Sequence, residues 1–373
     1  MNKNVEILLL APPVQATGGI ASWTRHILNY YSTIKSEDVS ITHLPKKRSK
    51  FISKSSSFLV RAIYGVKDNV IFLIKLVRYL CKYEFDIVHI TSSASLGLIR
   101  DVLFLRVFKI FKVKSVIHLH FGRIPELYES QNWEWRLINY VLKNFDLSIV
   151  LDELSHSLLS KLGYTKVTLV PNPLSTEVLN KIEDNKGIEV TKNKIVFAGH
   201  LLPSKGIVEL VQACIEIPNI KLIILGKIPD RKIKKSLLNI ASAKKDADWI
   251  EILGEKSIDY LIKEMMSSNV FVLPTYTEGF PNVILESMAC SCAIVTTPVG
   301  AIPEMLNILS DKACGICVSP RDVVELKGAI ESLLNDENLA IQYGKLARER
   351  VVEKYSISII WDKLYDSWIN LVY

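Results

Sequence analysis

Short aliphatic runs alternate along the chain with longer segments in which apolar residues recur every third or fourth position. In the first half the short runs are residues 5–11, 87–90, 115–119, 147–150 and 167–170. The longer segments between them are residues 19–34, 58–82, 96–111, 133–143 and 153–162. Continuous aliphatic runs are typical of parallel strands that helices cover on both faces. The pattern therefore predicts a doubly wound α/β domain.

The second half repeats this alternation. Its predicted strands are residues 195–198, 220–225, 250–253, 270–274, 293–296 and 315–318. Its predicted helices are residues 207–214, 233–243, 258–266, 282–288, 303–307 and 321–334. A Pro-Asn-Pro turn and a charged stretch at 171–194 separate the halves. We expect one domain over residues 1–175, a second over 190–356, and a last helix at 357–373.

The strongest candidate for chemistry follows the predicted strand at 270–274. Residues 277–286 read Thr-Glu-Gly-Phe-Pro-Asn-Val-Ile-Leu-Glu, so Glu278 falls in a loop and Glu286 about one turn inside the next helix. Loop N–H groups and a helix N-terminus favour an anion. Two carboxylates supply acceptors for hydroxyl groups, as sugars and ribose require. The alternative is a loop glutamate and a surface glutamate with no shared role.

This segment resembles the glutamate-x7-glutamate motif of glycosyltransferase family 4, retaining enzymes of the GT-B fold. Further similarities run from the first strand to about residue 320: Gly18-Gly19, Val170–Pro173, Phe197–Gly206 and Val299–Glu304, with Ala301 at the second Gly of a Gly-Gly-Ile-Pro-Glu turn. The resemblance implies two Rossmann-like domains facing across a cleft, with the last helix packed back on the first.

The resemblance also assigns residues to the donor, a nucleotide-diphospho-sugar with UDP or GDP. Lys205 would neutralise the leaving diphosphate. His200 stands where the family usually has arginine, so either it still binds the diphosphate or another basic group, such as Arg123, compensates. Glu286 would accept from ribose hydroxyls. The remaining donor-binding candidates are Glu278, Gly279, Phe280, Pro281, Asn282 and Val283.

In the first domain, His118 and His120 fall on the same side of a strand if it extends that far. The resemblance places His120 at the transferred sugar, as a catalytic residue beside Glu278 and Lys205. Gly18, Gly19 and Arg123 become acceptor-side candidates. The residues alone leave Arg123 either to bind acceptor phosphate or to pair with Glu126 at helical spacing.

Three patterns suggest metal or redox chemistry, and we set each aside. The His-x-His at 118–120 has no carboxylate or Cys beside it. Asp246 and Asp248 lie in a charged loop, as solvated carboxylates do. Cys314 and Cys317 fall on a predicted strand without a second pair. We expect a metal-independent enzyme without a cofactor.

The formal charge of +7 resides in the first half, where residues 1–180 carry 23 basic and 14 acidic side chains. Residues 46–82 hold ten basic side chains and only Asp68 as an acid, with apolar residues between them. This composition suits an anionic membrane surface, although an ordinary amphipathic core helix after a basic loop explains it equally. No nucleic-acid motif accompanies the charge.

The sequence shows no targeting segment and no run of about 18 apolar residues. We expect a cytoplasmic protein, peripheral on the inner face of the membrane if the basic segment binds there. The expected function is transfer of a sugar to a hydroxyl of a lipid-linked saccharide in bacterial surface polysaccharide assembly. The alternatives are another GT-B-type enzyme, an epimerase or a phosphorylase, and a non-catalytic protein that binds nucleotide-sugars.

Overall fold

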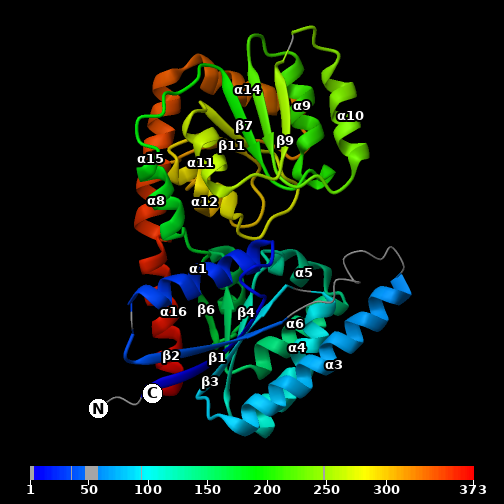
Figure 1. Ribbon diagram of the computed structural model, residues 1–373, viewed down its shortest axis with the longest axis vertical. Helices are drawn as coiled ribbons and strands as arrows, with labels where there is room; N and C mark the ends of the chain where they lie inside the picture. Colours follow the sequence, from blue (N-terminus) through cyan, green and yellow to red (C-terminus); the bar gives the residue numbers. More distant parts are fainter. Residues whose placement is uncertain (1–3, 35, 47–57, 94, 247) are drawn as a thin grey trace. The chain divides into compact units, whose positions relative to one another are not determined.

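The computed structural model of the chain describes residues 4–34, 36–46, 58–93, 95–246 and 248–373, without the side chains of residues 58–63 and 96 (Figure 1). The chain divides into two compact units. Unit 1 comprises Met1–Pro171 and Ile360–Tyr373, and unit 2 comprises Asn172–Ile359. Residues 172–189 therefore belong to unit 2, whereas the sequence pattern placed most of them between two domains.

Unit 1 contains a parallel sheet of six strands in the order β2-β1-β3-β4-β5-β6. Its strands are β1 (Val5–Ala11), β2 (Val39–Pro45), β3 (Ile87–Ser92), β4 (Lys114–Leu119), β5 (Leu147–Val150) and β6 (Val167–Leu169). Its helices are α1 (Gly19–Ile34), α3 (Phe58–Lys82), α4 (Leu96–Ile110), α5 (Ile124–Ser130), α6 (Trp133–Asn144), α7 (Glu153–Lys161) and, from its second turn, α16 (Ile357–Val372).

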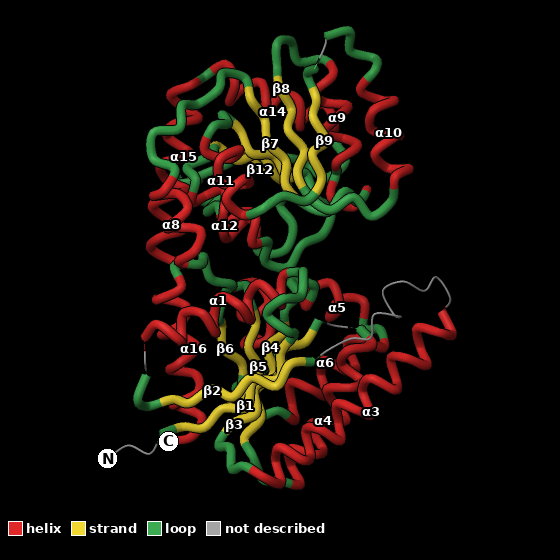
Figure 2. The backbone as a smooth tube through the Cα atoms, viewed as in Figure 1, coloured by secondary structure: helices red, strands yellow, loops and turns green. Residues whose placement is uncertain are grey.

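Helices cover both faces of this sheet (Figure 2). Leu8, Val88 and Ile117 point to one face, where they pack in a single core with aromatic residues of α4 such as Phe104 and Phe108. Strand alternation sends their neighbours to the opposite face, toward α1 and α16. The central strands are buried on both sides, as their unbroken aliphatic sequence predicts.

Unit 2 contains a second parallel sheet of six strands, in the order β12-β11-β10-β7-β8-β9. Its strands are β7 (Lys194–Ala198), β8 (Lys221–Leu225), β9 (Ile250–Gly254), β10 (Val270–Leu273), β11 (Ala293–Thr296) and β12 (Ile316–Cys317). Its helices are α8 (Thr176–Asp184), η1 (Pro203–Lys205), α9 (Ile207–Ile215), α10 (Arg231–Ala241), α11 (Ile258–Met266), α12 (Asn282–Ala289), α13 (Ile302–Met305), α14 (Val323–Asn335) and α15 (Glu337–Tyr355). The predicted pair of doubly wound units is thus confirmed.

Besides the three-residue helix η1, four elements were not predicted, and each has a physical reason. Strand β2 is an edge strand with polar residues among its apolar ones, so it lacks the aliphatic run of a central strand. Helix α8 buries only Val178 and Ile182, and α5 is only seven residues long. Helix α15 follows α14 with only Asp336 between them, and its residues are mostly polar, so no clear apolar stripe marks it in the sequence. No described helix combines the length and apolar composition needed to cross a bilayer.

Candidate functional site

Three loops of unit 2 meet at the carboxyl edge of its sheet. They follow β7, β10 and β11, which lie side by side in the sheet. The backbone N–H of Tyr276 donates to the Ser204 carbonyl at 2.9 Å, and that of Ala301 donates to the Gly279 carbonyl at 2.9 Å. The Thr297 hydroxyl donates to the carbonyl of Thr275. These bonds join segments up to 72 residues apart in the sequence into one loop cluster, at the edge where parallel α/β sheets bind ligands.

Lys205 and Glu278 form an ion pair inside this loop cluster, with the ammonium donating to Glu278 Oε1. Their side chains are only 22% and 14% exposed. Lys205 ends the short helix η1 after β7, and Glu278 lies in the loop after β10. The fold therefore brings together two of the predicted site residues that are 73 positions apart.

Two glycines allow the loops to approach so closely. Gly206 has φ +67°, and a Cβ there would lie 1.9 Å from the Pro274 carbonyl oxygen. Gly300 has φ +56°, and its Cβ would lie 2.4 Å from the Glu278 carbonyl oxygen. Both the backbone conformation and the space exclude a side chain. The Lys205 and Glu278 segments thus depend on these two glycines for their position.

Helix α12 starts directly after the Gly279–Pro281 segment. Asn282 and Val283 form its first turn and are half-buried, and Glu286 follows one turn later, also half-buried. Phe280 is buried, and its ring packs edge-on against Tyr355 with centroids 5.4 Å apart. The predicted placement of Glu278 in a loop and Glu286 inside a helix is what the structure shows.

His200 differs from the other donor-side candidates. Its side chain is exposed and has no side-chain hydrogen bond in the part of the chain that the structure describes. Its backbone carbonyl accepts from the Leu202 N–H at 2.7 Å, so the residue turns the chain after β7. The structure thus places His200 in the same loop as Lys205 but does not join their side chains.

The predicted residues of unit 1 follow β1 and β4. Gly18 has φ +112°, directly before α1, and open space surrounds both Gly18 and Gly19. Arg123 lies 3.7 Å from the carboxylate of Glu134, with 44% of its side chain exposed. The suggested pairing of Arg123 with Glu126 is therefore wrong, because the fold brings α6 to Arg123 from another direction.

His118 and His120 do lie on the same side of their strand, with ring centroids 4.1 Å apart. His89 of β3 and Trp23 of α1 complete this cluster. The ring centroid of Trp23 lies 4.9 Å from that of His118 and 5.1 Å from that of His120. His118 is fully buried, and neither of its ring nitrogens makes a well-formed hydrogen bond to a described residue.

Burial keeps this cluster uncharged. It lowers the pKa of His89 and of His120 to about 3, with neighbouring histidine and Lys46 charges acting in the same direction on His120. Burial, then the charges of His120 and His89, lower the pKa of His118 well below its usual value, and the Val170 carbonyl acts against them. A neutral imidazole can donate or accept a hydrogen bond without carrying charge. No group of three or more His, Cys, Asp or Glu side chains among the described residues is placed to hold a metal ion.

Comparison with known proteins decides the family of unit 2. Residues 180–350 match the sequence model of the family described as Glycosyl transferases group 1. The matched segment contains the whole loop cluster around Lys205 and Glu278. Residues 180–350 form a glycosyltransferase group 1 domain.

Two curated relatives of the group 1 domain illustrate its range. The chain is 31% identical over 198 residues to the capsular polysaccharide biosynthesis glycosyltransferase CapM of Staphylococcus aureus, covering 50% of this chain and 48% of the relative. It is 31% identical over 132 residues to an N,N'-diacetylbacillosaminyl-diphospho-undecaprenol alpha-1,3-N-acetylgalactosaminyltransferase of Campylobacter jejuni, covering 33% and 34%. The chain therefore spans about half the length of CapM and about a third of the length of the Campylobacter jejuni relative.

Solved structures extend the likeness to the whole chain. Sucrose-phosphate synthase from Thermosynechococcus elongatus superposes with a TM-score of 0.79 at 18% identity, covering 99% of both chains. HepE of Anabaena in complex with UDP-glucose superposes with a TM-score of 0.71 at 16% identity, covering 98% of this chain and 100% of the other. At such identities the likeness shows the fold, which is GT-B.

Several residues that support the loop cluster of the group 1 domain were not predicted from the sequence. The amide of Asn172 donates to the Phe280 carbonyl at 3.0 Å and to Asn282 Oδ1 at 3.2 Å. The Tyr276 hydroxyl donates to Glu209, and the Arg321 guanidinium lies 4.7 Å from the Tyr276 ring centre. Burial, then Glu209, raise the pKa of Tyr276 to about 12. Only the position of Tyr276 directly after a strand could have marked it beforehand.

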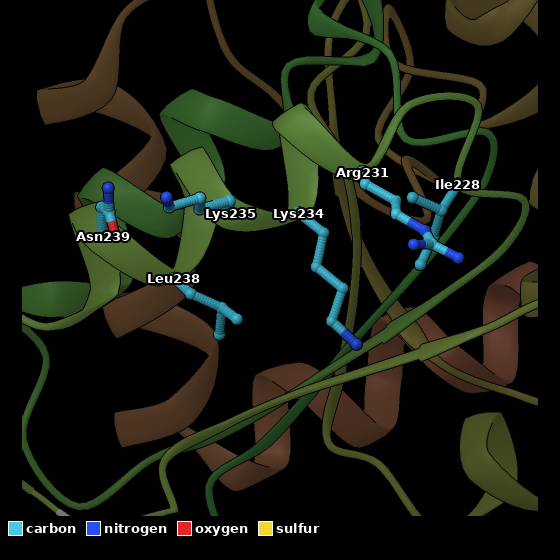
Figure 3. A pocket seen from close by; sticks show the side chains of 6 residues that line it. All are labelled: Ile228, Arg231, Lys234, Lys235, Leu238 and Asn239. Carbon is cyan, nitrogen blue, oxygen red and sulfur yellow. The ribbon is translucent and has the colours of Figure 1, made fainter.

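A hollow of about 640 Å³ also lies in the group 1 domain, at the start of α10. Its lining residues are Ile228, Arg231, Lys234, Lys235, Leu238 and Asn239 (Figure 3). Lys234 donates to the Ile252 carbonyl of β9 at 3.2 Å and is therefore already engaged. None of the predicted site residues lines this hollow, so we do not identify it with the loop cluster.

Proposed function

We propose that this chain is a retaining, metal-independent glycosyltransferase of family 4 that takes its sugar from a UDP- or GDP-sugar. The observation that supports the proposal most directly is the Lys205–Glu278 ion pair within the loop cluster of the group 1 domain. A lysine held there offers a compact cation to the departing diphosphate. HepE, a structural neighbour, has been solved with UDP-glucose, which agrees with a nucleotide-sugar donor.

The proposed chemistry exchanges one glycosidic bond for another. The bond from the sugar's anomeric carbon to the diphosphate breaks as a bond to the acceptor oxygen forms, and the acceptor proton passes to the departing phosphate. Lys205 opposes the negative charge that grows on that phosphate. Loss of one such pre-aimed donor typically slows a reaction by about 10²- to 10³-fold.

The other donor contacts follow from the positions of the loops. Glu278 accepts from sugar hydroxyls beside the N–H groups of Gly279, Phe280 and Asn282. Glu286, one turn into α12, accepts from the ribose. His200 is exposed in the Lys205 loop and is free to turn toward the diphosphate. A site of this kind needs no bound cofactor.

We assign the acceptor to unit 1, through Gly18, Gly19, His120 and Arg123. The open space around both glycines would admit a saccharide close to the backbone. The Campylobacter jejuni relative is named for a diphospho-undecaprenol acceptor and CapM for capsular polysaccharide. The first name supports a lipid-linked saccharide as acceptor, and the second supports surface polysaccharide assembly as the process. The proposed partner of the basic residues within 46–82 is an anionic membrane surface.

A donor panel tests this proposal. The purified chain would be heated with UDP-, GDP- and ADP-sugars, and the same panel repeated with Lys205→Ala, Glu286→Ala and the control Lys345→Ala on exposed α15. A donor at 100 times its Kd stabilises the fold by about 2.7 kcal/mol. We expect one donor to stabilise the wild type and the control but not the two site variants.

The outcomes separate the alternatives. Release of nucleoside diphosphate that depends on an added saccharide acceptor supports transfer. Free sugar or sugar phosphate as product would point to an epimerase or a phosphorylase. Donor binding without turnover on any acceptor would point to a binding protein, and equal stabilisation of all variants would remove the assigned site.

A further inference from the structure

Helix α3 exposes an apolar stripe along its length. Val66, Val70 and Ile74 lie four residues apart and therefore share one side of the helix, with exposed fractions of 66%, 49% and 49%. Ile71 lies beside them and is 54% exposed. The opposite side holds Phe72 and Leu76, which are buried in the core of unit 1. The inner side of helix α3 is thus packed in the core of unit 1, and its outer side exposes a second apolar surface to solvent.

Basic side chains border this stripe. Their positions are Lys67, Lys75, Arg78 and Lys82, all exposed. None of the four forms an ion pair with a carboxylate among the described residues. Lys75 and Lys82 lie over the rings of Tyr79 and Tyr83 instead. The acid of the helix, Asp68, is half-buried, so the outward side of α3 combines apolar groups with unneutralised positive charge.

The neighbouring helix α4 repeats this arrangement. Phe72 of α3 packs against Phe104 of α4 with ring centroids 5.5 Å apart, and the two helices run side by side on one face of the unit 1 sheet (Figure 1). Ile99, Leu103 and Ile110 share one side of α4 with the exposed Arg106, and Ile110 is 76% exposed. No single apolar stripe marks the surface of α4 in the sequence, because its apolar residues surround the helix.

We infer that the outward sides of α3 and α4 are a docking surface for an anionic lipid bilayer. The apolar side chains of this surface would enter the boundary between headgroups and acyl chains. They are Val66, Val70, Ile71 and Ile74 of α3 and Ile99, Leu103 and Ile110 of α4. Its flanking lysines and arginines would lie at the phosphate level, where each adds to binding. A protein partner is less suited, since interface cores are depleted in lysine.

The inference deepens the proposed function by naming the surface at which a lipid-linked acceptor is met. Of the basic segment identified in the sequence, Lys47, Arg48, Lys50 and Lys54 lie outside the described residues, and so does the side chain of Arg61. The described side chains of α3 and α4 form the proposed surface without them. Lipid binding can be measured without donor or acceptor, so its failure and a failure of sugar transfer are distinguishable.

The test uses co-sedimentation of the full chain with vesicles of phosphatidylcholine, with and without about one third phosphatidylglycerol. One variant replaces the α3 stripe (Val66→Gln, Val70→Gln, Ile71→Gln, Ile74→Gln), and a second replaces the four cations (Lys67→Gln, Lys75→Gln, Arg78→Gln, Lys82→Gln). A third replaces Ile99, Leu103 and Ile110 of α4 by Gln. The matched control replaces exposed residues of unit 2: Val324→Gln, Ile341→Gln, Lys232→Gln and Lys235→Gln.

We expect the wild type and the control to bind only the vesicles that contain phosphatidylglycerol. Loss of the cations should weaken binding by about fivefold per charge, and both apolar variants should bind at least about tenfold more weakly. A tryptophan introduced by Ile74→Trp should shift its emission to the blue on vesicle addition. Far-ultraviolet circular dichroism confirms that each variant is folded.

Three results would overturn the inference. Wild-type binding that the apolar variants retain would show charge attraction without insertion. Equal binding of the control and the α3 variants would place the contact elsewhere. A wild type that ignores vesicles but forms an oligomer, which the α3 variant dissociates, would make this surface an interface between proteins.

Discussion

The indole N–H of Trp368 donates a hydrogen bond to Nδ1 of His89 at 3.0 Å, in the interior of unit 1. The bond joins the last helix of the chain to the third strand, 279 residues earlier. It also determines the tautomer of His89, because a nitrogen that accepts this bond leaves the ring proton on Nε2. The C-terminal helix is therefore part of the structure around the histidine cluster.

Replacing Trp368 by Phe should destabilise unit 1. The change keeps an aromatic ring but removes the donor, which leaves His89 Nδ1 buried without a partner. We expect a loss of about 1–3 kcal/mol in the free energy of unfolding, measured by urea denaturation followed by circular dichroism. Trp133→Phe, at a half-exposed tryptophan, is the control and should change it by less than about 0.5 kcal/mol. If the two substitutions lower the free energy of unfolding equally, the Trp368–His89 hydrogen bond does not contribute to the stability of unit 1.

The buried histidines should make the chain sensitive to acid. Their pKa values are lowered in the folded state, to about 3 for His89 and His120, so the unfolded chain binds more protons at pH values between about 3 and 6.5. Stability is present above pH 6.5 and falls as the pH decreases through this window. Between pH 7.5 and 5.5 we expect a loss of about 1 kcal/mol for each histidine.

Urea denaturation at a series of pH values measures this dependence. His120→Gln should reduce its slope between pH 6 and 4 by up to about 1.4 kcal/mol per pH unit, the contribution of one proton. A wild-type stability that stays level from pH 7.5 to pH 5.5 would contradict the burial of neutral histidines.

Gly206→Ala should disturb the loop cluster and destabilise unit 2. A Cβ at Gly206 meets a backbone oxygen rather than a movable side chain, and the positive φ adds strain. We expect the free energy of unfolding to fall by more than about 2 kcal/mol. Gly328→Ala is the matched control, because α14 leaves open space there, and it should gain about 0.5–1 kcal/mol from helix propensity. Similar small effects at both positions would mean that the β7 loop does not need this close approach.

The outcome at Gly206 bears on how far the sequence could predict the structure. Aliphatic runs predicted all the central strands, because burial on both faces leaves a direct trace in composition. The edge strand β2 and helix α8 leave weaker traces, since most of their residues are not fully buried. Lys205 and Glu278 could each be placed after a strand, but their ion pair depends on strand order in the sheet. The Arg123–Glu134 pair shows the same limit, since helical spacing favoured Glu126.

The Lys205–Glu278 pair leads to a prediction that separates the roles of its two charges. A diphosphate is attracted by the Lys205 ammonium and repelled by the Glu278 carboxylate beside it. Lys205→Gln should therefore weaken binding of the free nucleoside diphosphate, UDP or GDP, by about tenfold or more. Glu278→Gln should leave that binding unchanged or strengthen it a few-fold, yet weaken binding of the corresponding nucleotide-sugar, whose hydroxyls lose a charged acceptor.

Calorimetric titration of both variants and of the wild type with the two ligands measures the four affinities. The control Lys345→Gln, on the exposed side of α15, should match the wild type with both. If Glu278→Gln weakens the free nucleoside diphosphate as much as Lys205→Gln does, the carboxylate serves to hold the lysine in place. Its assignment to the sugar would then be withdrawn, while Lys205 would keep its place at the diphosphate.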